Sequence, residues 1–135
     1  MARALQREQL AVVVEEDDAV AEQAPALLRV VAYHGALKAG AVVVNYSPLY
    51  VEEELAFQMQ DSGTEVMVTV DLDPLLPRVL SLLDRPGSPL KHVVACQFSS
   101  ALPMAKGLAF RVLHRKSIVP VPRGDGRVVP FKAMC

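Results

Sequence analysis

The stretch from Ala32 to Gly63 limits how this chain can fold more than any other, because a helix, an apolar strand, a turn and a second helix follow one another within it. The first helix carries small residues at positions that share one face, which lets a neighbouring backbone approach closely: Ala32, Gly35, Ala36 and Ala39. Gly40 then ends the helix, since glycine adopts a left-handed backbone without strain. The run Ala41–Val44 that follows is apolar without alternation, which is typical of a parallel strand covered by helices on both faces.

A shaped loop and a second helix follow this strand. Pro48 cannot donate to a sheet ladder, so we expect residues 45–50 to leave the sheet as a loop. Three carboxylates, Glu52 to Glu54, stand at the positive end of the next helix. Its predicted buried stripe is Val51, Leu55 and Met59, and Asp61, Ser62 and Gly63 end it.

Strands and helices continue to alternate along the rest of the chain. We expect strands at Leu10–Val14 (an edge or first strand), Glu65–Val70 and Leu90–Gln97. A helix opened by Pro25 reaches Ala39, and a second helix covers Pro74–Leu83 with Leu75, Val79, Leu82 and Leu83 facing inward. This order predicts an α/β fold, a partial parallel sheet of βαβ units flanked by helices.

The string GALKAGAVVVNYSPLY (Gly35–Tyr50), followed at fixed distance by Glu54, Leu55 and Asp61–Gly63, resembles the amino-terminal part of AMP-forming acyl-CoA synthetases. That adenylate-forming superfamily also contains luciferases and peptide-synthetase adenylation domains, and the resemblance is closest in its fatty-acyl-CoA ligase branch. It is strong from about Ala32 to Val70, loose from Asp71 to Met134, and poor over the first thirty or so residues. The resemblance implies parallel sheets wrapped by helices, as the residues themselves predict.

The resemblance also implies a chemistry, which is activation of a carboxylic acid with ATP and Mg2+ and transfer of the acyl group to coenzyme A. The family's later motifs carry that chemistry: a phosphate loop with a Lys, an adenine-contacting aromatic, a ribose-binding Asp and a Lys on a mobile carboxy-terminal domain. None of them occurs in these 135 residues. We therefore assign no catalytic, cofactor-binding or metal-binding residue, and we expect the chain to be an incomplete piece of the amino-terminal domain, inactive alone.

Composition and segment boundaries agree with this interpretation. An apolar share of 52% with only 5% aromatics suits an aliphatic interior rather than a nucleic-acid stacking surface, and a net charge of −1 does not attract a polyanion. We divide the chain into an acidic segment (1–24), an α/β subdomain (25–119) and a tail rich in Pro and Gly (120–135), in which Arg127–Val129 is too short for a confident strand. Cys96 and Cys135 fit neither a disulfide framework nor a metal site, and we expect a cytoplasmic setting.

Three groups of polar residues invite a functional interpretation. Asp71 and Asp73 follow a predicted strand, where open α/β sheets bind ligands, so Mg2+ or phosphoacceptor chemistry is one hypothesis. We favour the other, in which Asp73 caps the helix that begins at Pro74. The block Glu15–Asp18 is most simply a solvated charge run, and His92 is a surface residue without a nucleophile or carboxylate at recognisable spacing.

The carboxy-terminal third is basic. From Ala101 onward seven Lys and Arg residues face a single acid, Asp125. The predicted helix Ala101–Lys116 either uses its cations to complement its own carbonyl end or contacts a membrane surface peripherally, and we favour the former.

Two classes of function remain open on the sequence. One is a piece of an acyl-CoA ligase whose partner is the missing remainder of the enzyme, and the other is a noncatalytic interaction or dimerisation module derived from that family. We expect self-association in either class, because a sheet built for a larger domain exposes apolar area.

Overall fold

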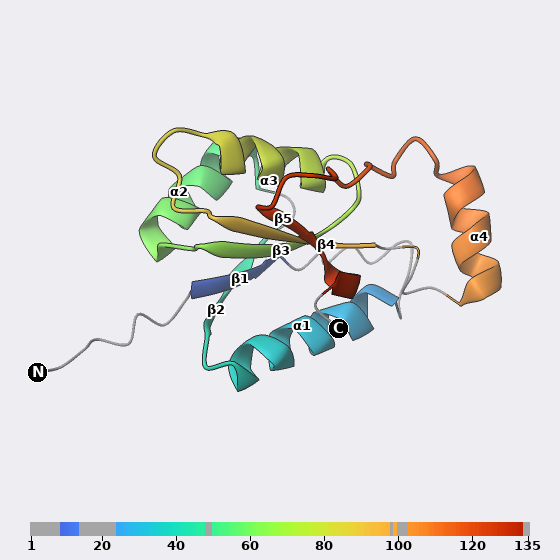
Figure 1. Cartoon of the computed structure of the whole chain (residues 1–135), viewed down its shortest axis with the longest axis horizontal. Helices are drawn as coiled ribbons and strands as arrows, with labels where there is room; N and C mark the ends of the chain where they lie inside the picture. Colours follow the sequence, from blue (N-terminus) through green and yellow to red (C-terminus); the bar gives the residue numbers. More distant parts are fainter. Residues whose placement is uncertain (1–8, 14–23, 48–49, 98, 100–102, 134–135) are drawn as a thin grey trace, which may run out of the picture.

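The computed structural model describes residues 9–13, 24–47, 50–97, 99 and 103–133, with side-chain burial described from Val30 onward. Strands and helices alternate in the order β1 (Gln9–Val13), α1 (Ala24–Lys38), β2 (Val42–Tyr46), α2 (Glu52–Ser62), β3 (Val66–Val70), α3 (Leu75–Asp84), β4 (His92–Cys96), α4 (Met104–Leu113), β5 (Val128–Pro130) and the 3-10 helix η2 (Phe131–Ala133). The α/β class predicted from the sequence is confirmed, and Figure 1 shows helices on both faces of one sheet.

The sheet is parallel throughout its five strands, in the order β2-β1-β3-β4-β5. β1 is an interior strand, paired with β2 through Leu10↔Val43 and with β3 through Leu10↔Val66. The predicted alternative that this segment is an edge strand is therefore wrong. The basic tail also returns to the sheet, because Val128–Pro130 pairs with β4 where the sequence predicted no confident strand.

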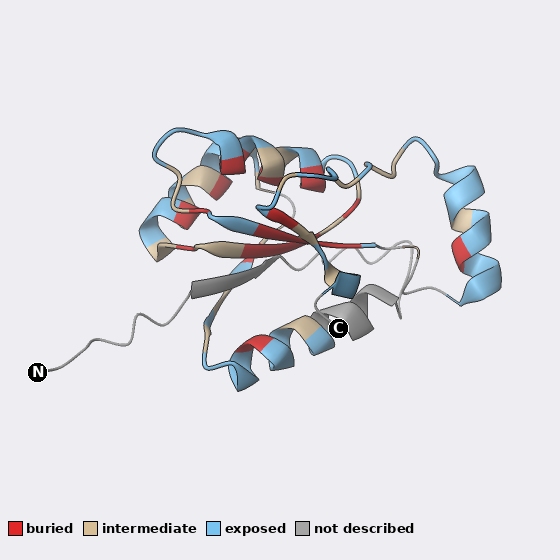
Figure 2. Cartoon of the chain, viewed as in Figure 1, coloured by how far each residue is buried: buried red, intermediate tan, exposed pale blue. Residues whose placement is uncertain are grey.

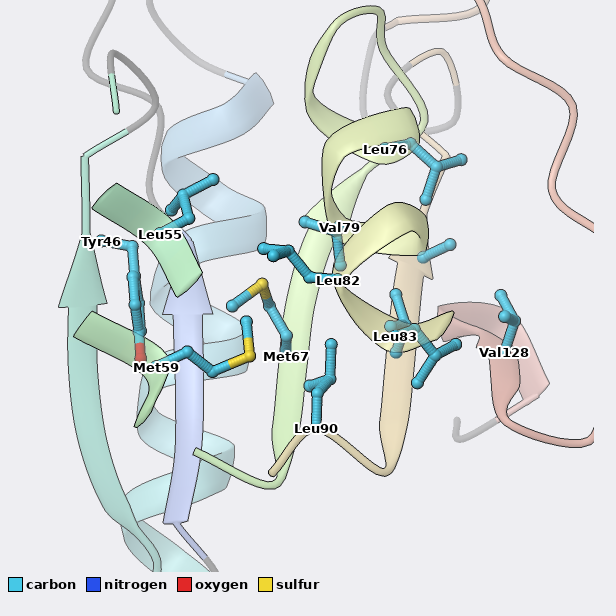
Figure 3. Close-up of a cluster of buried hydrophobic side chains, with 12 residues drawn as sticks. Tyr46, Leu55, Met59, Met67, Leu76, Val79, Leu82, Leu83, Leu90 and Val128 are labelled. Atoms are coloured by element: carbon cyan, nitrogen blue, oxygen red, sulfur yellow. The ribbon is translucent and has the colours of Figure 1, made fainter. Parts of the chain in front are cut away.

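The main hydrophobic core lies between the sheet and the layer of α2 and α3 (Figure 3). Its centre is fully buried: Met67 from β3, Leu76 from α3 and Val93 from β4 each have 0% exposure. Burying a side chain of this size stabilises the fold by roughly 1.5–3 kcal/mol relative to leaving it in water. The inward residues predicted for α3 are confirmed, and Leu76 joins them.

The opposite face of the sheet is covered less completely. A smaller cluster of Val68, Val94 and Cys96 lies there, with Ala32 of α1 and Phe131 of η2 packed against it. α1 still exposes Val30, Val31 and Leu37 by about half of their surface (52%, 48% and 47%). The two faces of the sheet are therefore unequally covered, and Figure 2 shows the described part of α1 as mostly exposed.

Three predictions about burial are wrong, for identifiable reasons. The apolar strand β2 is parallel as predicted, but it is covered incompletely: Val43 and Val44 pack against the two core clusters, whereas Val42 and Asn45 are exposed, because β2 is the last strand on its side of the sheet. The small face of α1 is only partly buried, since Ala36 is covered but Gly35 is exposed, and a Cβ added to Gly35 would meet no atom within 4 Å. Val51 is 55% exposed because it precedes α2 as its cap rather than joining the buried stripe of Leu55 and Met59.

The helix ends follow local chemistry that the sequence does indicate. After α1, the amide of Gly40 donates to Leu37 O and that of Ala41 to Ala36 O, both at 3.0 Å, and Gly40 has a φ of 76°. These two hydrogen bonds around a left-handed glycine satisfy carbonyls that the helix leaves unpaired. Gly63 ends α2 in the same backbone region, with a φ of 64°.

Tyr46 is the largest side chain that is almost fully buried, at 2% exposure. Its hydroxyl lies 2.8 Å from Ser62 Oγ and 2.7 Å from Thr64 Oγ1, and these two oxygens are 2.8 Å apart. The three hydroxyls join the end of β2, the end of α2 and the entrance of β3. A ring from the edge strand is thereby fixed inside the main core.

We expect Tyr46→Phe to lower the free energy of unfolding by about 1 kcal/mol, because the ring still packs but its hydroxyl bonds are lost. Tyr46→Ala also leaves a cavity and should cost roughly 3–5 kcal/mol. Urea unfolding measures both losses. Tyr33→Phe is the matched control, since Tyr33 is 39% exposed on α1, and a loss there equal to that of Tyr46→Phe would contradict the assignment.

Arg127 holds β5 against α3. Its Nη2 donates to Asp84 Oδ1 and to Asp125 Oδ2, each at 2.8 Å, and its Nε donates to Asp125 Oδ1 at 3.1 Å. The side-chain hydrogen bond from Arg127 lowers the pKa of the Asp125 carboxyl below its ordinary value of 3.8. The charged form of Asp125 therefore stabilises the folded state.

The pH dependence follows from the sign of this shift. A carboxyl whose pKa is lowered by folding contributes stability above its unfolded pKa and loses that contribution as the pH falls through the folded pKa. We expect Arg127→Gln to destabilise the chain at neutral pH, with a difference from the parent chain that shrinks as the pH falls below 3.8. Urea unfolding at stepped pH values checks this, and Arg123→Gln, an exposed arginine without an ion pair among the described residues, should show no such trend.

Candidate functional site

The strand order reverses between β1 and β3, which marks a candidate binding edge. β1 pairs with β2 on one side and with β3 on the other. α1 lies on one face of the sheet, and α2 and α3 lie on the opposite face (Figure 1). In open α/β sheets a crevice forms at such a reversal, outside the carboxyl ends of the strands. Ligand binding is therefore expected at the edge where β3 ends at Val70.

The segment that leaves β3 at this edge is already occupied by another part of the chain. The Asp71 amide donates to Cys96 O at 3.0 Å, and Asp71 O accepts from the Val119 amide at 2.9 Å. The Asp73 amide donates to Ser117 O at 2.9 Å, and Leu72 forms an antiparallel bridge with Ile118. Residues 117–119 therefore run antiparallel along residues 71–73 and close this part of the edge.

The two carboxylates of this segment do not share an environment. Asp71 is buried at 6% exposure, whereas Asp73 is exposed. The predicted cap is also wrong, because α3 begins at Leu75 with Pro74 as its first flanking residue, and no side chain makes a capping hydrogen bond. Among the described residues, no group of three His, Cys, Asp or Glu side chains could hold a metal ion.

The connections that leave the carboxyl ends of β1, β2, β3 and β4 share an unusual composition. They are residues 14–23, 47–51, 71–74 and 97–103. They contain no glycine, no lysine and no arginine, but seven acidic residues: Glu15, Glu16, Asp17, Asp18, Glu22, Asp71 and Asp73. Three of the chain's seven glycines instead serve the connections from helix back to strand, Gly40, Gly63 and Gly87, each at positive φ.

This composition is unsuited to phosphate binding. Phosphate groups in α/β folds are held by a glycine-rich turn after a strand, whose backbone amides point at the anion, and usually by a Lys or Arg. The amino end of α2 also has its own carboxylates, and Glu54 Oε2 accepts from the Val51 amide at 3.1 Å. The segments that follow these strands in the sequence therefore lack the glycine-rich turn that holds a phosphate.

Two open grooves flank Phe57 on the outer surface of α2. A groove of about 300 Å³ lies towards the α3–β4 connection and is bounded by Arg85, Pro86 and Ser88. One of about 490 Å³ lies towards Tyr50, Glu54 and Asp61. Acids surround an exposed apolar ring here, and neither groove is lined by a His, Cys or Lys among the described residues.

The remaining sequence candidates are dispersed. His92 is exposed at the start of β4, which is the opposite end of the strand from the candidate edge. Cys96 is buried at 1% exposure at the end of β4, as predicted for a strand thiol. Cys135 and Glu15–Asp18 lie outside the described residues.

Comparison with known families identifies the scaffold. The family of AMP-binding enzymes matches residues 1–121. The chain belongs to this family. Long-chain-fatty-acid–CoA ligases are among its curated relatives: that of Escherichia coli O6:H1 is 34% identical over 110 residues and that of Haemophilus influenzae 33% over 111, each covering 79% of this chain and 19% of the relative. The Bacillus subtilis ligase is 29% identical over 89 residues, which are 66% of this chain and 15% of the relative.

The chain thus spans less than a fifth of the length of the relatives it matches. Its resemblance to the acyl-CoA ligase branch of the AMP-binding family, drawn from Gly35–Tyr50 and the residues after it, is confirmed.

The polar residues that organise this part of the sheet were not found from the sequence. The partners of Tyr46 lie 16 and 18 residues further on, so no local pattern connects them. The pairing of residues 71–73 with 117–119 spans an even longer interval. The one signal present in the sequence is the distribution of glycines and acidic residues between the connections, and it can be read only when the strand ends are known.

Thr64 and Thr69 show how hydrogen bonding decides the effect of a buried hydroxyl on stability, because the two residues are similarly buried, at 0% and 2%, but differ in their hydrogen bonds. Thr64 Oγ1 bonds Tyr46 and Ser62, whereas Thr69 Oγ1 has no partner in the described structure. We expect Thr69→Val to raise the free energy of unfolding by about 1 kcal/mol, because a buried hydroxyl without a partner is removed. Thr64→Val should lower it by about 1–2 kcal/mol. Urea unfolding of both variants is decisive, since shifts of the same sign would contradict this assignment.

Proposed function

We propose that the chain is the amino-terminal piece of an AMP-forming acyl-CoA ligase. The complete enzyme would activate a fatty acid, or another carboxylic acid, with ATP and Mg2+ to an acyl-adenylate with release of pyrophosphate. The thiol of coenzyme A would then take the acyl group with release of AMP. The identity of 34% over 110 residues to a long-chain ligase supports this proposal, because the match covers 79% of this chain.

In this proposal the chain supplies part of the scaffold, and the remainder of the ligase supplies the residues that bind the nucleotide. The observation that carries this division is the composition of the segments that follow the first four strands in the sequence, which include seven carboxylates and no glycine, lysine or arginine. Such segments offer no glycine-rich amide cradle for a triphosphate. The chain alone is therefore inactive, and ATP, Mg2+ and coenzyme A are cofactors of the complete enzyme.

We propose that the complete ligase works in the cytoplasm, where the thiol of Cys96, which is buried at 1% exposure, stays reduced. Among the described residues, no helix is long and apolar enough to cross a bilayer.

We expect no ATP–pyrophosphate exchange by the isolated chain with fatty acids of any length, and no saturable heat of Mg-ATP binding by calorimetry. A full-length long-chain ligase assayed in parallel is the positive control. Exchange above the enzyme-free background would refute the proposed division of labour, because an edge of this composition should not hold the triphosphate.

A second candidate is a noncatalytic interaction or dimerisation module of the same ancestry. The half-exposed Val30, Val31 and Leu37 on α1 favour it, and so does the free edge of β2, which has no proline or lysine to discourage strand pairing. The two candidates are distinguished by adding the remainder of a related ligase to this chain. A ligase piece should restore exchange activity when combined with the remainder of a relative, whereas a module should form a stable dimer in sedimentation velocity and restore nothing.

A further inference from the structure

α4 exposes more apolar surface than any other helix of the described chain. Met104, Leu108, Val112 and Leu113 have exposures of 94%, 67%, 70% and 78%. At 100° per residue, these four and the two alanines between them fill one continuous half of the helix circumference, roughly 180° wide. The six residues, Met104, Ala105, Leu108, Ala109, Val112 and Leu113, are called the apolar arc below.

Two cations border this arc. On the same helical projection Lys106 falls about 20° beyond Leu113, and Arg111 falls about 20° before Met104. Arg115 and Lys116 follow directly after the helix. None of the four forms an ion pair with a described residue. The apolar half of α4 is therefore framed by unpaired positive charge.

The body of the protein does not use the apolar arc. In Figure 1, α4 stands apart from the sheet and from the helices that cover it, and Figure 2 shows most of its surface as exposed. The ring of Phe110, on the other half of α4, stacks on His114 with centroids 4.8 Å apart. The alternative, in which the cations complement the carbonyl end of the helix, explains the cations near residue 113 but does not explain why the apolar arc is exposed.

Charge favours a lipid surface over a protein as the occupant. Residues 97–124, which include α4, contain five cations and no carboxylate. Protein interfaces exclude lysine from their centres and match charges of both signs across the contact. An anionic bilayer instead accepts an apolar half between its headgroups while lysine and arginine at the borders reach the phosphates.

We propose that α4 is an interfacial helix that docks the chain on an anionic lipid surface, with the apolar arc at the level of the headgroups and Lys106 and Arg111 on lipid phosphates. α4 has ten residues and cannot cross a bilayer, so it lies in the plane of the surface. This proposal goes beyond the ligase assignment and does not depend on it.

Co-sedimentation of the full chain with vesicles tests the proposal, using phosphatidylcholine vesicles with and without phosphatidylserine. We expect binding to phosphatidylserine vesicles at low salt, weakened at high salt. Lys106→Gln and Arg111→Gln should each reduce the partition coefficient roughly fivefold. Leu108→Gln should reduce it tenfold or more, because its apolar side chain no longer enters the interface.

A matched control comes from α2. Phe57 is 75% exposed, as apolar as Leu108, but surrounded by Glu53, Glu54 and Asp61. Phe57→Gln should leave vesicle binding unchanged. All of these side chains are exposed, so unaltered urea unfolding confirms that each variant still folds.

A second measurement reports where α4 lies. The chain has no tryptophan, so Leu113→Trp places a single tryptophan in the arc, which can be excited apart from the three tyrosines. Its emission should shift to the blue when phosphatidylserine vesicles are added. Absence of vesicle binding at low salt would overturn the proposal. So would binding that is unaffected by Leu108→Gln, or a dimer in sedimentation velocity that Leu108→Gln dissolves while no vesicle binding occurs, since the arc would then contact protein.

Discussion

Everything in this structure depends on covering both faces of a parallel sheet, because such sheets are stable only when helices bury them from both sides. α2 and α3 do this fully on one face, where Met67, Leu76 and Val93 are sealed from solvent. On the other face α1 and η2 cover the central strands but leave the outer half of α1 in water. This imbalance agrees with the ligase piece proposed above, in which further segments of the enzyme would pack on the exposed side of α1.

Some local chemistry was readable from the sequence. Gly40 and Gly63 end their helices, and the spacing of Leu75, Val79 and Leu82 places them in the core. Two local predictions failed, since Asp73 does not cap α3 and Val51 precedes α2 instead of joining its buried stripe. The other predictions failed where the outcome depends on neighbours distant in sequence. A run of valines does not reveal whether a strand stands at an edge, so β2 was expected to be buried. The three residues of β5 carry too little periodicity to reveal that they extend the sheet beside β4.

The candidate site could be located from the sequence but not interpreted from it. A strand followed by Asp71 and Asp73 correctly marks a carboxyl edge, yet it gives no sign that residues 117–119 pair with that segment. Nor does it show that one carboxylate is buried and the other exposed. Once the strand ends are fixed, composition becomes informative, because glycines in the helix-to-strand turns shape the scaffold, while their absence after the strands removes the phosphate cradle.

The net charge of −1 conceals a separation of charge along the chain. Residues 97–124, which include α4, carry five cations and no carboxylate, whereas the first turn of α2 carries the carboxylates Glu52, Glu53 and Glu54. A negative surface would therefore attract the α4 region and repel the acidic end of α2, which orients the chain as well as binding it. A mixture of charges on both regions would give attraction without orientation, so the separation itself favours docking through α4.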